Sequence, residues 1–376
     1  MDARLTDEQQ RIQETAEEFI ESNGGIELAR RRMEGETEVI DELWDELADL
    51  DYTAMTVPFE YDGFGEDMIY LTALLEVAGK YALPGPLPET AAFAVPLLNT
   101  LGTDDQKEQY LPATAAGDIR WSFALYDDRT EPLPDAIQLD ATVTDDGYAL
   151  DGTKTLVPYG GEVDSLIVAA RTRSGSDYGG ISLFIVDTAD VETRELQSLD
   201  RVRPMYEVEL SDVTVSEDRL LGPIHGAGSA LENAIDRFTV ASCAMLVGAA
   251  DQAVSLSAEH GNERTQYGQP VGRFQAVKHR VVDMWVDMQA SRSLVYYAAW
   301  ALENDEPDAS RLVASTKTYA ADRLNRAFGD GMKNHGGMGF TWDHDGHIYL
   351  KQAKAWRNFL RSPEEYADAV IDARTT

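Results

Sequence analysis

The sequence predicts a mainly α-helical protein with a central β domain, and three observations support this fold class. Up to about residue 118, apolar residues recur at three- and four-residue spacing, as on one face of a helix. From about residue 119 to 222, short β-branched runs alternate with polar turns. From about residue 226 onward, long helical patterns return. A chain of 376 residues exceeds one comfortable hydrophobic core, so two or three packed domains are expected.

Residues 1–118 are expected to form an N-terminal helical domain. The stretches VIDELWDELADL and MIYLTALLEVAGKYA carry their apolar residues at helical spacing. Two turn-rich breaks, VPFEYDGFGED and LPGPLPET, interrupt the pattern, because prolines and glycines end helices.

Residues 119–222 are expected to form an antiparallel β domain. The stretch ATVTDDGYALDGTKTLV alternates around two Asp-Gly dipeptides, which favour tight hairpin turns. The runs SLIVAA, ISLFIVD and EVELSDVTV are short, rich in β-branched residues and bounded by polar turns.

Residues 223–376 are expected to form a C-terminal helical domain. In its second long helix, five apolar residues share one helical face and are expected to face the core. They are Phe274, Val277, Val281, Trp285 and Met288. The charged residues between them, such as Lys278 and Asp283, face elsewhere, so packing alone explains this helix.

The charge balance excludes some classes of partner. The sequence holds 32 basic and 67 acidic residues, a net charge of −35, which argues against nucleic acid and against anionic membrane surfaces. The acids are spread over every segment, which indicates a solvated surface adapted to high salt. An anionic ligand would therefore have to be attracted by a local concentration of arginines, helix N-termini and backbone N–H groups.

No targeting or membrane segment is expected. No stretch approaches the roughly 18 consecutive apolar residues that a membrane span needs, and the N-terminal stretch is acidic where a signal peptide is basic and then apolar. We therefore expect a cytoplasmic protein. The single cysteine, Cys243, lies in an apolar run and excludes an internal disulfide and a cysteine metal cluster. A small buried hydrophobic residue is its expected role, and no metal site is predicted.

The stretch RTQYGQP, which precedes the second long helix, is not explained by packing. It supplies the guanidinium of Arg264, the amide of Gln266 and the aromatic ring of Tyr267 beside Gly268. These groups can hold a pyrophosphate and a flat ring, with the glycine allowing close backbone approach. From these residues alone, a plain surface loop remains an equal alternative.

The longer stretch RTQYGQPVGRFQAVKHRVVDM resembles the Arg-x-Gln-Phe-Gly and Phe-Gln signature of FAD-dependent acyl-CoA dehydrogenases. Other segments also resemble family segments and occur in the family's order: LGTDDQKEQYLPATAAGD, YALDGTKTLVPYGGEVDSLIVAAR, EVELSDVTVSEDRLLG and NHGGMGFTWDHDGHIYLKQAK. The likeness covers nearly the whole chain. It implies an N-terminal helical domain, a middle β-barrel and a C-terminal four-helix bundle, assembled as a dimer or a dimer of dimers.

The resemblance implies FAD as cofactor, bound between the β domain and the C-terminal bundle and reaching the neighbouring subunit. Arg264, Gln266 and Tyr267 would contact the diphosphate end of the cofactor, and Gln275 would contact its ribityl or adenosine portion. Gly336, Gly337 and Gly339 would form a close backbone turn against the partner's cofactor. His335 is typical of the family in that turn, where a structural role is at least as well supported as a binding role.

The reaction that the resemblance implies needs a carboxylate base, and its two family positions fall near Phe238 and Leu360, which cannot take a proton. Asp236 is a weak candidate, two residues and about 200° around the helix from the first position. Other nearby carboxylates are Asp343, Asp345, Glu364 and Glu365. For each of these five, an ordinary solvated carboxylate is the simpler interpretation.

The segments that would enclose the flavin ring also depart from the family pattern. In place of a glycine-rich loop the sequence reads ALYDDRTEPLPDAIQLD, where Thr130, Glu131 and Pro132 are the only resemblance. After GTK, the sequence offers Leu156 and Pro158 where the family has Trp and Thr.

Two functions from different classes follow from the resemblance. The first, which we predict, is a FAD-dependent acyl-CoA dehydrogenase that passes electrons to an electron-transferring flavoprotein. The alternative is a catalytically incomplete subunit that completes the cofactor site of a sister chain in a heteromeric acyl-CoA dehydrogenase. The departures near the flavin ring and the missing base favour the alternative, whereas the intact diphosphate side favours the enzyme.

Overall fold

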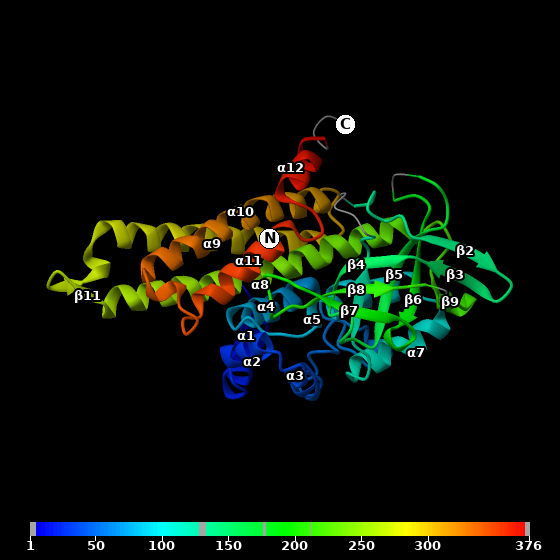
Figure 1. Cartoon of the computed structure of the whole chain (residues 1–376), viewed down its shortest axis with the longest axis horizontal. Helices are drawn as coiled ribbons and strands as arrows, with labels where there is room; N and C mark the ends of the chain where they lie inside the picture. Colours follow the sequence, from blue (N-terminus) through cyan, green and yellow to red (C-terminus); the bar gives the residue numbers. More distant parts are fainter. Residues whose placement is uncertain (1–4, 128–132, 176–177, 212, 373–376) are drawn as a thin grey trace. The chain divides into compact units, whose positions relative to one another are not determined.

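The computed structural model describes residues 5–127, 133–175, 178–211 and 213–372 (Figure 1). The chain divides into two compact units. The first unit comprises Met1–Glu36, Met68–Pro84 and Thr239–Thr376, and the second comprises Thr37–Asp67 and Gly85–Phe238. Each unit therefore joins segments that are far apart in the sequence. The predicted division into three domains at residues 118 and 222 stays a prediction.

Three helices of the first unit come from the N-terminal part of the chain: α1 (Asp7–Ser22), α2 (Ile26–Glu34) and α4 (Met68–Lys80). Helix α1 begins at a capping box, in which Thr6 Oγ1 accepts a hydrogen bond from the Gln9 N–H and Gln9 Oε1 accepts one from the Thr6 N–H. This exchange satisfies two N–H groups that the first turn leaves without helical partners. Helix α1 then packs against α4.

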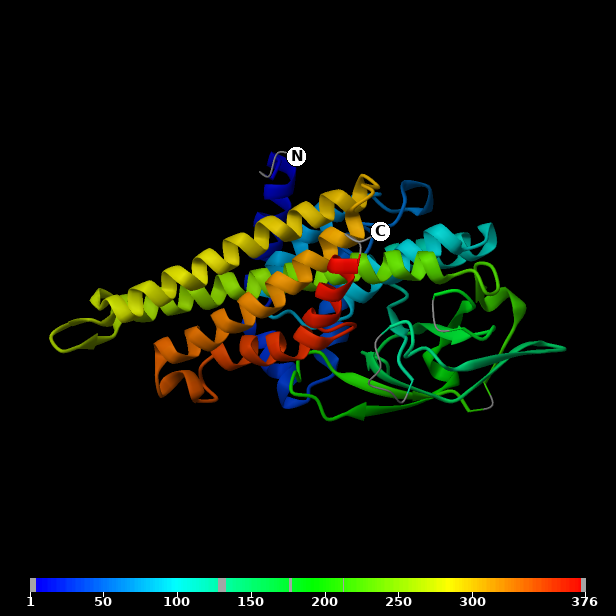
Figure 2. The ribbon, with the colours of Figure 1, turned by 90° about the horizontal axis from the view of Figure 1, so that it is seen from above.

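Five helices follow in the C-terminal part of the chain. They are α8 (Gly228–Glu263), α9 (Gln275–Glu303), α10 (Ala309–His335), α11 (Gly346–Asn358) and α12 (Pro363–Asp372). The boundary between the units falls inside α8, between Phe238 and Thr239. Within the first unit, α8, α9 and α10 run side by side (Figures 1 and 2), and α10 also packs against α11 and α12.

Helix α8 is a core helix. By length and composition alone it could cross a membrane, but 78% of its most apolar 18-residue window is buried inside the protein. Cys243 lies in this buried part with no exposed surface, as predicted for a small hydrophobic residue.

The helices of the second unit come from both of its chain segments, Thr37–Asp67 and Gly85–Phe238. They are α3 (Glu38–Asp49), the short η1 (Phe59–Tyr61), α5 (Leu87–Glu89), the π-helical turn η2 (Thr90–Ala94), α6 (Val95–Leu101) and α7 (Asp104–Ala115). Because α5, η2 and α6 follow one another without a break, residues 87–101 form one continuous helical segment. Trp44 of α3 donates a hydrogen bond of 2.8 Å from Nε1 to the Gly117 carbonyl oxygen after α7.

The strands of the second unit form a seven-stranded and a three-stranded sheet. The first has the order β10-β6-β5-β2-β3-β9, with β1 also paired to β5, and the second has the order β4-β8-β7. The strands are β1 (Trp121–Ala124), β2 (Asp140–Thr144), β3 (Gly147–Asp151), β4 (Thr153–Pro158), β5 (Ser165–Arg171), β6 (Ile181–Asp187), β7 (Glu192–Leu196), β8 (Met205–Glu209), β9 (Val213–Val215) and β10 (Leu220–Leu221), with 3-10 turns η3 (Thr188–Asp190) and η4 (Glu217–Arg219). Strand β5, buried along its whole length, lies at the centre.

The predicted fold class is confirmed: helices precede and follow a central β domain, and most strand pairs are antiparallel. Two pairs differ: β2 meets β5 in parallel at Asp140 and Arg171, and β1 pairs with β5 in parallel register from Trp121–Ser165 to Ala124–Val168. No local pattern predicts this pairing, since the helical and extended segments that precede β1 determine which edge it reaches.

One predicted core residue is wrong. Trp285 is 50% exposed, as are its neighbours Val282 and Val286 to a similar extent. The buried stripe of α9 runs instead through Met284, Met288, Ser291 and Val295. Both faces of this helix carry apolar residues, so the pattern alone could not decide which face α4 and α10 cover.

Candidate functional site

The RTQYGQP stretch forms a β-hairpin between α8 and α9. Strands β11 (Thr265–Gln266) and β12 (Gln269–Pro270) are joined by Tyr267 and Gly268, whose φ angles are +55° and +77°. Two consecutive positive φ angles define a two-residue turn that glycine adopts without strain and tyrosine does not. The hairpin projects beyond the helices at one end of the first unit (Figure 1).

The predicted diphosphate-binding residues are all exposed on this hairpin. Arg264 and Gln266 are exposed, and Tyr267 is 92% exposed, with its ring perpendicular to that of Phe274 at a centroid distance of 6.1 Å. Gln275 is exposed at the first position of α9, after the 3-10 turn η5 (Val271–Arg273). Because they are exposed, these groups are accessible to a ligand or a second chain. The strained φ of Tyr267 is a feature often found at binding sites.

The predicted glycine turn ends α10, and its three glycines differ in whether the structure requires them. Gly336 is the C-cap residue with φ +61°, a conformation that favours glycine. A Cβ on Gly339, in η6 (Met338–Phe340), would lie 2.7 Å from the Met332 carbonyl oxygen, so packing requires this glycine. Gly337 has a negative φ, and a Cβ there would meet nothing within 4 Å. The described residues therefore give no reason for a glycine at 337, where another molecule could approach the backbone.

Three histidine rings that lie against one another at tilted angles, here called the histidine stack, link the hairpin to the glycine turn. The His335 ring lies 4.7 Å from the His260 ring at the end of α8 and 4.1 Å from the His344 ring. Its Nδ1 lies 2.8 Å from the Gly331 carbonyl oxygen, and its Nε2 lies 3.2 Å from that of Leu256. His335 thus has a structural role, and Arg264 and Gly336 follow directly from the two helix ends that it joins.

The histidine stack also has electrostatic consequences. The pKa values of His260 and His344 are lowered below 6.5, chiefly by burial and next by the neighbouring His335.

Among the residues that the structure describes, no group of three or more His, Cys, Asp or Glu side chains is arranged to hold a metal ion.

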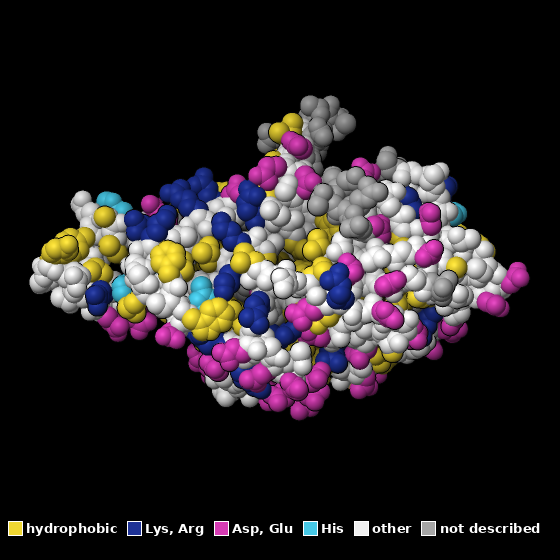
Figure 3. Space-filling model, viewed as in Figure 1, with side chains coloured by type: hydrophobic (Ala, Val, Ile, Leu, Met, Phe, Trp, Pro, Cys, Tyr) yellow, Lys and Arg dark blue, Asp and Glu magenta, His cyan; other side chains and the backbone are white. Residues whose placement is uncertain are grey.

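Cationic side chains gather over the C-terminal helices in spite of the acidic composition (Figure 3). On α9 and α10, three of them surround the largely buried carboxylate of Asp330: Lys333 at 2.9 Å, Arg326 at 3.7 Å and Arg280 at 3.9 Å. Arg326 and Lys333 are more than half exposed. This is the local concentration of positive charge that an anionic ligand would need against the field of the whole protein.

The two positions where the resemblance implies a base are filled by buried apolar side chains. Phe238 has no exposed surface, and its ring lies 4.9 Å from that of Phe123 and 6.4 Å from that of Phe93, both edge to face. Leu360 is 3% exposed and has a φ of +67°. A dry aromatic cluster, made of Phe93, Phe123 and Phe238, therefore occupies the first position.

A buried ion pair lies next to this aromatic cluster, and no sequence pattern predicted it. The Arg203 guanidinium lies 5.3 Å from the Phe238 ring centre and donates to Glu89 Oε1 from Nε at 2.8 Å and also from Nη2. Glu89 is fully buried, and its Oε2 has no hydrogen-bond partner in the described parts of the chain. Burial raises the pKa of Glu89, and the attraction of Arg203 opposes this. A lone glutamate in a very acidic chain carries no local signal of burial.

The candidate carboxylates fall into two groups. Asp236 is only 4% exposed, so the expectation of a solvated carboxylate is wrong there: apolar neighbours on α8 carry it into the interior. Asp345 pairs with Arg30 at 2.5 Å, and Glu364 pairs with Arg357 at 2.8 Å. Glu365 accepts a hydrogen bond from the Ser362 N–H at the start of α12, and Asp343 is exposed. The last four side chains thus have structural or solvated positions.

The segment after GTK has an unusual backbone. Leu156 and Tyr159 have φ angles of +53° and +51°, and Leu156 is 41% exposed. The Tyr159 hydroxyl accepts a hydrogen bond of 2.9 Å from the Gly85 N–H, which ties this segment to the LPGPLPET stretch. Thr130, Glu131 and Pro132 lie outside the described residues.

The fold defines a mainly helical protein with a central β domain, and comparisons with known proteins give its family. The sequence models of the acyl-CoA dehydrogenase N-terminal domain and C-terminal domain match residues 6–118 and 225–359. The short-chain-specific acyl-CoA dehydrogenase of Megasphaera elsdenii is 28% identical over 369 residues, which cover 94% of each chain. The chain therefore belongs to the acyl-CoA dehydrogenase family, whose members are oxidoreductases.

Two solved structures agree with this assignment. The butyryl-CoA dehydrogenase of Megasphaera elsdenii superimposes with a TM-score of 0.92 at 26% identity, over 100% of both chains. A chain from a study of the electron transferring flavoprotein of Acidaminococcus fermentans also superimposes with a TM-score of 0.92, at 25% identity over 99% of both chains.

Proposed function

We propose that the protein takes part in the FAD-dependent α,β-dehydrogenation of an acyl-CoA thioester. For this reaction a carboxylate of the protein would remove a proton from the carbon next to the thioester carbonyl, and FAD, when bound, would supply the acceptor for the hydride of the following carbon. The observation that carries the proposal is the exposed pair of elements at one end of the first unit: the Arg264 hairpin and the Gly336 turn, joined by the histidine stack.

The residues at this end fit the diphosphate part of the cofactor. Arg264 would donate charge-assisted hydrogen bonds to phosphate oxygens, and the exposed Gln266 and Gln275 would donate amide hydrogens. Tyr267 offers a flat surface, and Gly337 leaves its backbone open. The cations around Asp330 would raise the local concentration of an anion.

Because these groups point away from their own helices, we propose that they complete a cofactor site together with a second chain. The partner is a second copy of this chain or a sister acyl-CoA dehydrogenase subunit. An electron-transferring flavoprotein is the proposed electron acceptor, in line with the family and with the study in which one solved neighbour was determined.

A second function, that of a cofactor-completing subunit without its own base, is favoured by one observation. Phe238 and Leu360 occupy both positions implied for the base, and the aromatic cluster leaves Phe238 no exposed surface. Loss of a general base typically costs about 10²–10⁴-fold in rate, so a sister chain would have to supply the chemistry.

The visible spectrum of the chain expressed alone distinguishes the two functions. Yellow protein that is bleached by butyryl-CoA under anaerobic conditions indicates a complete enzyme. Colourless protein that becomes yellow and active only with a sister chain indicates the completing subunit. Protein that binds no FAD under either condition contradicts both functions.

A variant tests the missing base directly. Leu360→Glu places a carboxyl group at one implied base position, and Leu360→Gln is its uncharged match. If the remaining site binds substrate, bleaching by butyryl-CoA should be faster in Leu360→Glu than in Leu360→Gln. Equal bleaching rates in the two folded, FAD-containing variants would show that position 360 cannot serve as the base.

A further inference from the structure

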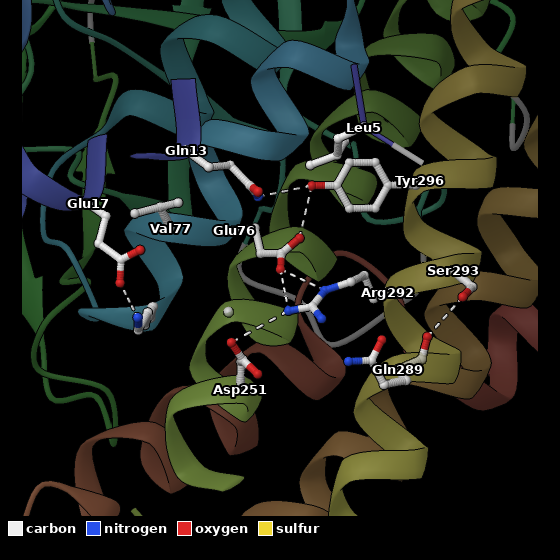
Figure 4. Close-up of a pocket in the computed structure, with 12 residues that line it drawn as sticks. Leu5, Gln13, Glu17, Glu76, Val77, Asp251, Gln289, Arg292, Ser293 and Tyr296 are labelled. Atoms are coloured by element: carbon white, nitrogen blue, oxygen red, sulfur yellow. Dashed lines mark hydrogen bonds and ion pairs between the residues drawn. The ribbon is translucent and has the colours of Figure 1, made fainter. Parts of the chain in front are cut away.

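A polar cavity lies inside the first unit, between helices α1, α4, α8 and α9 (Figure 4). Its volume is about 400 Å³, enough for a small molecule. Charged and amide side chains line most of it, and the apolar lining is limited to Leu5, Val77 and the Tyr296 ring. None of the residues assigned above to the cofactor lines this cavity.

One wall of the cavity is an ordered chain of hydrogen bonds. The Arg292 guanidinium donates from Nε to Glu76 Oε1 at 2.7 Å, and its Nη2 lies 2.5 Å from the same oxygen. Glu76 Oε2 accepts a hydrogen bond of 2.9 Å from the Tyr296 hydroxyl, which itself accepts one from Gln13 Nε2. Glu76 is 8% exposed, so this network fixes one face of Arg292.

The backbone behind this network is also fixed. Helices α4 and α8 touch at Gly248, where a Cβ would lie 1.7 Å from the Glu76 carbonyl oxygen. Such a close contact leaves α4 no room to move toward α8, so the backbone that carries Glu76 is held in place. Glu76 in turn orients the Arg292 guanidinium, which comes from α9.

Next to this network, the cavity lining also holds polar groups whose hydrogen-bonding capacity is not fully used. Arg292 Nη2 lies 3.6 Å from Asp251 Oδ2, an ion pair too long for a direct hydrogen bond. In the part of the chain that the structure describes, Arg292 Nη1 and the Gln289 side-chain amide have no hydrogen-bond partner. Figure 4 shows Asp251, Arg292 and Gln289 next to one another, and the dashed line at Gln289 runs from Ser293 to its backbone oxygen, not to its side-chain amide. Donors and acceptors are thus presented together.

The charges of the lining restrict the ligand class. Glu17, Glu76 and Asp251 oppose Lys80 and Arg292. Glu76 is neutralised by Arg292, and Lys80 pairs with Glu17, which leaves Asp251 as the carboxylate with the weakest pairing. A polyanion such as a nucleotide would be repelled, and an acyl chain would leave these polar groups unsolvated.

We propose that this cavity binds a small zwitterion of the α-amino acid type. Its ammonium group would donate to Asp251, and its carboxylate would accept from Arg292 Nη1 and the Gln289 amide. One molecule would thereby bridge the 3.6 Å gap between two opposite charges that do not hydrogen-bond directly.

The test uses the full chain and simple probes at constant ionic strength. Binding of L-alanine and L-glutamine is measured by isothermal titration calorimetry and thermal unfolding. Ethylamine and propionate are the matched single-charge probes, because each carries only one of the two charged groups. The zwitterions should bind, and each single-charge probe should bind at least roughly tenfold more weakly, because a charge-assisted hydrogen bond is lost.

Variants test whether the cavity is the binding site. Asp251→Asn and Gln289→Leu should each weaken zwitterion binding by roughly tenfold or more, since each removes a polar contact. Glu259→Gln is the control, because Glu259 is an exposed carboxylate on the same helix that does not line the cavity. Unaltered binding in Asp251→Asn, equal binding of ethylamine, or no binding of either zwitterion would each overturn the proposal. Because none of these measurements involves acyl-CoA, they stand apart from the proposed dehydrogenase function.

Discussion

The Arg264 hairpin and the aromatic cluster around Phe238 are opposites in physical character. The hairpin is exposed and has two positive φ angles, and a lysine and two arginines surround Asp330 on the same helical unit. The aromatic cluster is buried, and the buried ion pair of Glu89 and Arg203 lies beside it.

The difference teaches that cofactor binding and proton abstraction have different requirements, which this chain has met to different extents. Diphosphate binding needs exposed donors at a helix end, and these residues are present. Proton abstraction needs an accessible carboxylate, and packing fills both implied positions with Phe238 and Leu360. This difference is the reason for proposing that a second chain completes the cofactor site.

The largest expected effect comes from breaking the buried pair in the interior region. Arg203→Ala should destabilise the protein by about 3–5 kcal/mol, because it leaves the Glu89 carboxylate buried without its counter-charge. Denaturant unfolding measures the effect. The double variant Glu89→Leu with Arg203→Met should recover most of the loss, and a small cost for Arg203→Ala alone would contradict the buried pairing.

In the exposed region, substitution should affect the cofactor and not the fold. Arg264→Ala should weaken FAD retention by about 1.5–3 kcal/mol, the value of a charge-assisted hydrogen bond to phosphate. The ligand-free Tm should stay unchanged, because Arg264 is exposed. Arg311→Ala, at the opposite end of α10, removes the same charge and should retain FAD. Unaltered FAD content in Arg264→Ala would break the comparison.

Glycine substitutions sharpen the contrast between tight interior packing and open positions. Gly248→Ala should destabilise by about 1–3 kcal/mol or more, since its Cβ would meet the Glu76 carbonyl oxygen at 1.7 Å. Gly329→Ala, inside α10 with nothing within 4 Å, should instead stabilise by up to about 1 kcal/mol. Thermal and denaturant unfolding of both variants would test this, and equal effects would contradict the packing.

The smallest expected effect is a pH dependence of the histidine stack. The pKa of His344 is lowered in the folded protein, chiefly by burial, so the unfolded chain takes up its proton first as the pH falls below 6.5. The stability that His344 contributes is therefore fully present above pH 6.5, and it is lost as the pH falls toward the pKa of His344 in the folded protein. His344→Gln should reduce the fall in Tm between pH 7.5 and 5.5, relative to the original protein. A steeper fall in the variant would reverse this sign.

Local sequence patterns were sufficient to predict many of the helices and hairpins. The periodicity of VIDELWDELADL and the Asp-Gly turns depend on neighbours within a few residues, so helices and hairpins could be predicted from them. The two-residue turn at Tyr267 and Gly268 was not predicted, because tyrosine does not favour a positive φ. The family resemblance then indicated which exposed residues would face a cofactor, and their roles stay predictions.

The sequence by itself determined the element types, their order and the composition of the Arg264 hairpin, because these depend on short-range spacing and backbone preference. Only the tertiary structure decided that Trp285 is exposed, that β1 joins β5 in parallel, and that Glu89 meets Arg203 and Glu76 meets Arg292. The physical reason is sequence separation: these contacts join residues about forty to more than two hundred positions apart, or depend on which helix covers which face. A charged residue has the same local signature whether it meets water or a buried partner.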